Sequence, residues 1–148
     1  MIKVKLNDIT KDVKKGTRLL DLLDPSVQKN YYTCKVNGRL RELTYVLNKN
    51  AEIEFLGIDN TESMKTYEAS LRYITAKAFH ELYPNVSVRF NYNVSRSIFV
   101  KSETPNFIID SNVVNNIRNY ILELVEKDQP IERVTVDIET AKKIYKEY

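Results

Sequence analysis

The side chains best suited to catalysis are few in this chain of 148 residues. His80 is the only histidine and Cys34 the only cysteine, so a site built on paired imidazoles or paired thiols is excluded. Tyr32, Thr33 and Val36 surround Cys34 and indicate a strand, which favours a small buried apolar side chain over a reactive thiol. His80 falls off the apolar stripe of its predicted helix and is expected at the surface. The sequence therefore predicts no catalytic residue and no metal site.

Phosphate-binding loops are absent as well. The three glycines, Gly16, Gly38 and Gly57, are about twenty residues apart, so neither a P-loop nor a dinucleotide-binding glycine loop can be formed. Carboxylates are plentiful, for example Asp8 with Asp12, but none has the partners of a general acid and base. Phosphoryl transfer by these residues is excluded.

Basic residues gather mildly in the first part of the chain. Residues 1–58 hold eleven Lys or Arg and seven Asp or Glu, a net of +4, whereas residues 59–148 have a net of −1. Lys11, Lys14 and Lys15 have no predicted acidic neighbour and are candidates for nucleic-acid or phosphate contact. Solubility explains the same residues, and the sequence leaves the two interpretations open.

The elements that must position these residues are organised around one helix. Tyr67 to Pro84 places apolar side chains in steps of three and four, which predicts one amphipathic helix with a single stripe facing a core. The stripe is expected at Tyr67, Leu71, Ile74, Ala78 and Leu82. Pro84 ends the helix near Leu82.

Residues 1–58 read as a compact β unit. Alternation predicts strands at 2–6, 9–13, 31–36, 39–43 and 51–56, and Leu19 to Leu23 predict a two-turn helix with Thr17 as its N-cap. This order is that of a ubiquitin-like β-grasp, in which the first and last strands are parallel. Lys3 and Lys5 would then lie beside Glu52 and Glu54. A polar link at 57–63 is expected to separate this unit from the rest.

Residues 63–148 predict a small α+β unit, so the whole chain is assigned to the α+β class. After the central helix, a hairpin spans 86–101, and Asp110 caps a long helix whose apolar face packs on the hairpin. A strand at 131–136 and a helix from Ile138 to Tyr148, capped by Asp137, complete the prediction. The charged helix at the end leads us to expect a chain cut from a longer protein.

Both parts of the chain resemble a known family. The first part of the chain resembles the TGS domain, the β-grasp module at the N-terminus of threonyl-tRNA synthetases and of stringent-response enzymes. The stretches that resemble it are MIKVKLNDITKDVKKGTRLLDLL and CKVNGRLRELTYVLNKNAEIEFL. The second part resembles the start of the editing region that follows TGS in threonyl-tRNA synthetase. The stretches that resemble it are AFHELYPNVSV, YILELVEKDQPIERVTV and ETAKKIYKEY. Together they cover nearly the whole chain.

The resemblance implies an editing site that this chain has lost. In the synthetase family the helix carries an HxxxH pair that belongs to the site for hydrolysis of mischarged tRNA. Tyr73 and Lys77 stand at those two positions, and Ala69 stands at a further histidine position. Neither tyrosine nor lysine supplies a neutral imidazole near neutral pH, so editing hydrolysis is not expected.

A second resemblance leads to a different function. The same two-domain head precedes the kinase domain of bacterial uridine kinases, where the helix reads LSFIF, and SLRYITAKAFHELYP with NVSRSIFV is closer to that version. This implies a non-catalytic regulatory or ligand-binding region whose parent is an ATP-dependent nucleoside kinase with Mg²⁺. The partner would be the downstream P-loop domain, and no cofactor is expected in these residues. The alternative is a tRNA-binding TGS module without editing activity.

In the kinase interpretation, a cleft between the two units would hold a small ligand. Arg72, Tyr73 and Lys77 from the helix and Arg96 from the hairpin turn would border it. A tyrosine ring covering a lysine stem at an interface would give the same pattern. With no apolar run long enough to cross a membrane and no signal peptide, we expect a cytoplasmic protein without a membrane partner.

Overall fold

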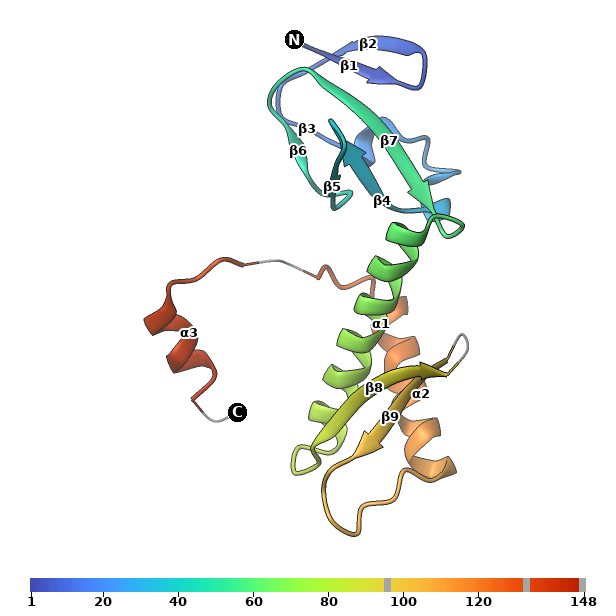
Figure 1. Cartoon of the computed structure of the whole chain (residues 1–148), viewed down its shortest axis with the longest axis vertical. Helices are drawn as coiled ribbons and strands as arrows, with labels where there is room; N and C mark the ends of the chain where they lie inside the picture. Colours follow the sequence, from blue (N-terminus) through green and yellow to red (C-terminus); the bar gives the residue numbers. More distant parts are fainter. Residues whose placement is uncertain (95–96, 132–133, 147–148) are drawn as a thin grey trace.

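The computed structural model describes residues 1–94, 97–131 and 134–146, and confirms the α+β class. A twisted sheet at the N-terminal end stands on one end of a long helix, α1 (Thr61–Leu82), and a hairpin and a second helix, α2 (Ser111–Glu126), pack along its other end (Figure 1). We call residues 2–57 the β-grasp unit, and α1, the hairpin and α2 the helix–hairpin unit.

The β-grasp unit is built on a five-stranded sheet of order β2-β1-β7-β4-β5. Its strands are β1 (Ile2–Leu6), β2 (Ile9–Val13), β4 (Tyr31–Val36), β5 (Arg39–Arg41) and β7 (Ala51–Gly57). β1 and β7 are parallel neighbours at the centre, as the β-grasp prediction requires. Asn37 and Gly38 have positive φ angles of 50° and 74°, the geometry of a tight hairpin turn.

The predicted charge pairs across β1 and β7 are only half confirmed. Lys5 lies opposite Glu52, and its Nζ is 2.8 Å from the Glu52 Oε1. Lys3, however, lies opposite Asp12, and Glu54 lies opposite Lys35. The parallel pairing of β1 with β7 runs only from Val4 and Ala51 to Leu6 and Ile53. Lys3 therefore lies before its start and Glu54 beyond its end.

The two-turn helix predicted at Leu19–Leu23 is wrong. Thr17 and Arg18 form a short strand, β3 (Thr17–Arg18), paired with β6 (Val46–Leu47), and only a single 3₁₀ turn, η1 (Leu20–Leu22), follows. Thr17 is not an N-cap, because its Oγ1 donates to the Lys14 carbonyl at 2.8 Å. A second 3₁₀ turn, η2 (Gln28–Asn30), precedes β4.

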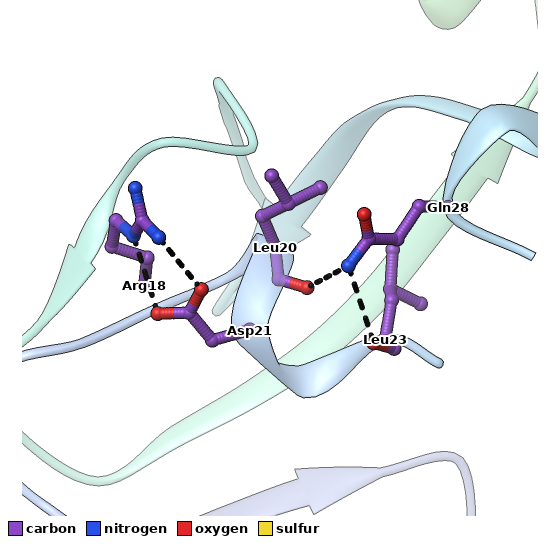
Figure 2. Close-up of polar contacts among 5 residues, drawn as sticks. All are labelled: Arg18, Leu20, Asp21, Leu23 and Gln28. Carbon is purple, nitrogen blue, oxygen red and sulfur yellow. Dashed lines mark hydrogen bonds and ion pairs between the residues drawn. The ribbon is translucent and has the colours of Figure 1, made fainter. Parts of the chain in front are cut away.

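Side-chain hydrogen bonds hold this irregular segment in place. The Gln28 Nε2 donates to the carbonyls of Leu20 and Leu23 at 3.2 and 3.4 Å, and so supplies donors that a longer helix would have supplied (Figure 2). Arg18 makes two hydrogen bonds to the Asp21 carboxylate, which lowers the pKa of Asp21 (Figure 2). Side-chain hydrogen bonds therefore hold the segment between β3 and η2, where a longer helix would have used backbone hydrogen bonds.

One cluster of apolar side chains fills the β-grasp unit. Its buried members are Ile2, Val4, Leu19, Cys34, Val36, Leu47, Ala51 and Ile53. Cys34 is fully buried, as predicted, and burial raises the pKa of its thiol to about 12. Phe55, which follows the buried Ala51 and Ile53 in the alternation along β7, is half-buried against this cluster.

α1 begins six residues earlier than predicted. Asn60 is its N-cap, and the Asn60 Oδ1 accepts from the N–H groups of Glu62 and Ser63 at 2.9 and 3.3 Å. The polar link predicted at 57–63 is therefore reduced to a short turn after β7. Because the first turns of α1 pack on β4 and β7, the division into 1–58 and 63–148 stays a prediction.

The apolar stripe predicted on α1 is only partly buried. Ala78 is buried, but Leu71 and Leu82 are exposed, and the neighbouring Phe79 takes the core position instead. The reason is that α1 meets different partners along its length. Its start faces the sheet and its end faces α2, so no single stripe serves both.

The second core joins α1 and α2 to the hairpin, as predicted. The hairpin consists of β8 (Val88–Val94) and β9 (Ser97–Ser102), and Asp110 caps α2 by accepting from the Val113 N–H at 2.9 Å. Ala78, Phe79, Val113 and Ile117 form the buried centre. The described strands of this hairpin lie within the predicted range of 86–101, apart from the last residue of β9, Ser102.

The C-terminal segment departs furthest from prediction. The described residues of the expected strand at 131–136 form no strand, and Ile131 and Val134 are exposed without a partner strand to pair with. α3 (Ile138–Ile144) follows, with Asp137 as the predicted cap, and lies well apart from the rest of the chain (Figure 1). Among the described residues, no helix is both long enough and apolar enough to cross a membrane.

Candidate functional site

Two of the predicted site residues share one face of α1. Tyr73 and Lys77, one helical turn apart, line the same cavity of about 370 Å³ between α1, α2 and the segment that follows α2. Leu124 and Val125 of α2 form its apolar wall, and the backbone from Asp128 to Ile131 closes one side. Tyr73 and Lys77, which the resemblance matches to the HxxxH pair, therefore line one cavity.

The groups in that cavity are not suited to hydrolysis. The Lys77 Nζ lies 3.1 Å from the Glu81 Oε1, and this pairing raises the pKa of Lys77, so the side chain stays an ammonium ion and cannot act as a base or metal ligand. Ala69 is exposed and has no polar side-chain atom. Within the described residues, no three histidine, cysteine or acidic side chains come close enough to hold a metal ion.

Arg72 belongs to a different cavity. Its guanidinium donates to the Asn93 Oδ1 at 2.9 Å and lies 3.6 Å from the Glu68 carboxylate, beside a larger cavity of about 920 Å³ between α1 and the hairpin. The predicted ligand set is thus divided, because Arg72 points away from the cavity that Tyr73 and Lys77 line. Arg96 lies outside the described residues.

The predicted basic residues lie on one edge strand of the β-grasp sheet and in the turn that follows it. Lys11 is on the exposed edge strand β2, and Lys14 and Lys15 follow in the turn after it. The Gly16 N–H donates to the Leu47 carbonyl at 2.8 Å, which fastens this turn to the 47–50 loop. None of the three lysines forms an ion pair within the part of the chain that the structure describes.

A fourth lysine in this group was missed by sequence reasoning. The Asn50 Oδ1 accepts from the Lys3 N–H at 2.9 Å, so the 47–50 loop and its Lys49 lie against the start of β1. The sequence Asn48-Lys49-Asn50 indicated only a turn. The β-grasp pairing of the first and last strands was the signal that could have placed Lys49 near Lys14. We call Lys11, Lys14, Lys15 and Lys49 the basic end.

Comparison with known proteins finds that the sequence of this chain is similar to threonine–tRNA ligases. The chain is 26% identical over 151 aligned positions to a threonine–tRNA ligase of Natranaerobius thermophilus, covering 99% of this chain and 24% of the ligase. A ligase of Clostridium kluyveri gives the same identity and coverage, and one of Rubrobacter xylanophilus is 26% identical over 139 positions, 92% of this chain and 22% of the ligase. No family model matches the chain.

These matches confirm part of the predicted resemblance. The similarity is distant, extends over nearly the whole chain and concerns the N-terminal region of the ligases. The chain spans about a quarter of the length of these curated relatives. They give no support to the predicted relation with uridine kinases.

Proposed function

We propose that this chain is a tRNA-binding module without editing activity, and that the basic end of the β-grasp unit contacts the phosphate backbone. The observation that carries the proposal is the gathering of Lys11, Lys14, Lys15 and Lys49 at one end of the sheet, in a chain similar to threonine–tRNA ligases. Lysines neutralise phosphates and release condensed counterions, which drives sequence-independent binding.

Three other cations of the β-grasp unit differ from the basic end, because each is paired with a carboxylate. Lys5 is paired with Glu52 and Arg18 with Asp21, and Lys35 of β4 is paired with Glu62 of α1. Their charge is compensated within the fold, whereas the charge of the basic end is not. The lysines of the basic end therefore keep their charge available to phosphates where the turn after β2 meets the 47–50 loop.

The absence of editing rests on the cavity beside α1. A phenol at position 73 and an ammonium at position 77 offer neither a neutral base nor a metal ligand there. Purified protein is expected to leave seryl-tRNA intact. A regulatory role for a nucleoside kinase remains a prediction from sequence, and the ligase relatives favour tRNA binding over it.

A tRNA titration at several salt concentrations tests the proposal. The change Lys11→Gln, Lys14→Gln and Lys15→Gln in one protein should weaken binding and reduce the slope of log affinity against log salt by about 0.9 for each lost phosphate contact. The control variant changes Lys142, Lys143 and Lys146 to Gln. It removes the same number of positive charges near α3. Equal losses in both variants, or no binding by the wild type at low salt, would overturn the proposal.

A further inference from the structure

The outer face of the β8–β9 hairpin carries two exposed aromatic rings stacked on each other. The ring centroids of Tyr92 and Phe99 lie 5.7 Å apart with their planes only 12° from parallel. Tyr92 is 68% exposed and Phe99 is 43% exposed. Aromatic side chains this open to water are unusual outside binding surfaces, because each leaves a large apolar area unburied.

A bulge in the hairpin creates this arrangement. In β9, Ile98 and Val100 turn toward the helices, so Phe99 faces the opposite way. The register of the hairpin shifts between Phe90 and Asn93, which brings Tyr92 to the same outer face as Phe99. No described element covers this face, while α1 and α2 cover the other one (Figure 1).

Positive charge lies next to the rings on the same face. Lys101 is two residues beyond Phe99, and Arg89 is its direct cross-strand partner. Like charges in this position repel each other. Glu103 pairs with Arg89 at 2.9 Å, but Lys101 forms no ion pair within the described residues. Because Glu103 already compensates the charge of Arg89, Lys101 is the cation beside the rings that an anionic group would pair with.

We propose that Tyr92 and Phe99 form a stacking platform for an unpaired base of single-stranded RNA, with Lys101 contacting the adjacent phosphate. Every base has a π-face, and phosphates follow each base along the strand, so rings beside a cation match this ligand. The apolar area is limited to two rings among charged and polar neighbours, which is too small for a stable protein interface. This inference rests on the proposed RNA binding, at a site separate from the basic end.

A fluorescent single-stranded RNA tests the platform in the full chain. The probe is an eight-nucleotide RNA with 2-aminopurine at a central position, whose fluorescence falls when the base stacks. Wild-type protein should quench it. Tyr92→Leu and Phe99→Leu keep apolar bulk but remove a π-face, so each should abolish quenching and weaken binding between about 5-fold and about 150-fold, the range for loss of one stacked base.

Conservative and distant variants separate stacking from a general loss of structure. Tyr92→Phe keeps the ring and should bind like the wild type, and Tyr145→Leu removes a comparably exposed tyrosine next to α3, far from the hairpin (Figure 1). Lys101→Gln should reduce the salt slope by about 0.7, the value for one phosphate of a single strand. Lys143→Gln, on α3, should not.

The outcomes distinguish this site from the proposed function. If the leucine variants bind the RNA and tRNA like the wild type, or if ultracentrifugation shows a dimer that Tyr92→Leu dissociates, the platform is overturned while tRNA binding through the basic end stands. If quenching depends on Tyr92 but tRNA binding is insensitive to Lys11, Lys14 and Lys15, the platform stands and the proposed function fails. No binding of either RNA at low salt overturns both.

Discussion

The β-grasp unit and the helix–hairpin unit differ in how completely they bury their apolar side chains. Val4, Leu19 and Cys34 are fully inaccessible in the first unit, and eight buried side chains form its core, although Ile9 at the sheet edge is exposed. The second unit has a smaller core, and Leu122 and Val114 of α2 lie half exposed beside a nearly apolar cavity of about 320 Å³. The contrast teaches that the first unit buries a larger core, whereas the second has a small core and leaves an apolar surface open beside α2.

The largest effect expected from this contrast comes from equal truncations in the two units. Leu47→Ala removes a side chain that is 1% exposed and should lower the free energy of unfolding by about 2 to 5 kcal/mol. Leu122→Ala removes a side chain that is 50% exposed and should change it by less than about 0.5 kcal/mol. Urea unfolding followed by circular dichroism measures both, and similar losses would remove the distinction.

The junction between the units gives a smaller effect. The Ser63 Oγ is buried and donates to the Leu56 carbonyl at 3.0 Å, so it joins the first turn of α1 to β7. Ser63→Ala should cost about 1 to 3 kcal/mol of unfolding free energy, because the buried acceptor loses a donor. Ser70→Ala, an exposed serine whose Oγ bonds the Thr66 carbonyl within the helix, is the matched control and should be nearly neutral. A neutral Ser63→Ala would mean that this hydrogen bond does not stabilise the junction.

A further effect is a pH dependence that tests whether water is excluded from the first core. The folded thiol of Cys34 has a pKa of about 12, above its ordinary value of 9.0, so between these values only the unfolded chain loses the proton. Stability contributed by the protonated thiol is complete below pH 9 and falls by about 1.4 kcal/mol per pH unit above it.

The variant Cys34→Ala isolates this contribution from the titration of lysines and tyrosines. Urea midpoints of the wild type and the variant should differ by a constant amount below pH 9 and converge between pH 9 and 11. Parallel profiles over that range would show that the thiol ionises as readily in the folded core as in water. The contrast between a closed and an open unit would then be weaker than the burial of Cys34 indicates.

Local signals in the sequence predicted most of the fold. Alternation at Ile2 and Val4, the Asn37-Gly38 turn and the Asp110 cap each act within a few residues, and the structure contains all three. The β3–β6 pair was missed because each strand has only two residues and gains its hydrogen bonds from a distant segment. The run at Leu19–Leu23 was too short for its periodicity to separate a helix from a single turn.

The candidate site was predicted less well, for a similar reason. Helical spacing placed Tyr73 and Lys77 on one face, and the cavity they share agrees with it. Arg72 precedes Tyr73 by one residue, or about 100° around the helix, and therefore lies at the other cavity. The stacking of Tyr92 on Phe99 depends on a bulge in the hairpin, which no pattern of residue types indicated.

The continuous helix α1 has a consequence for how the two RNA contacts are spaced. Its 22 residues span about 33 Å, with the β-grasp sheet fixed to its first turns and the hairpin to its last. Each residue inserted into or removed from the middle would turn the hairpin by about 100° relative to the basic end and shift it by about 1.5 Å. The length of α1 thus sets both the distance and the relative rotation of the two surfaces. Only an insertion that adds close to a whole number of helical turns would keep both surfaces facing the same ligand.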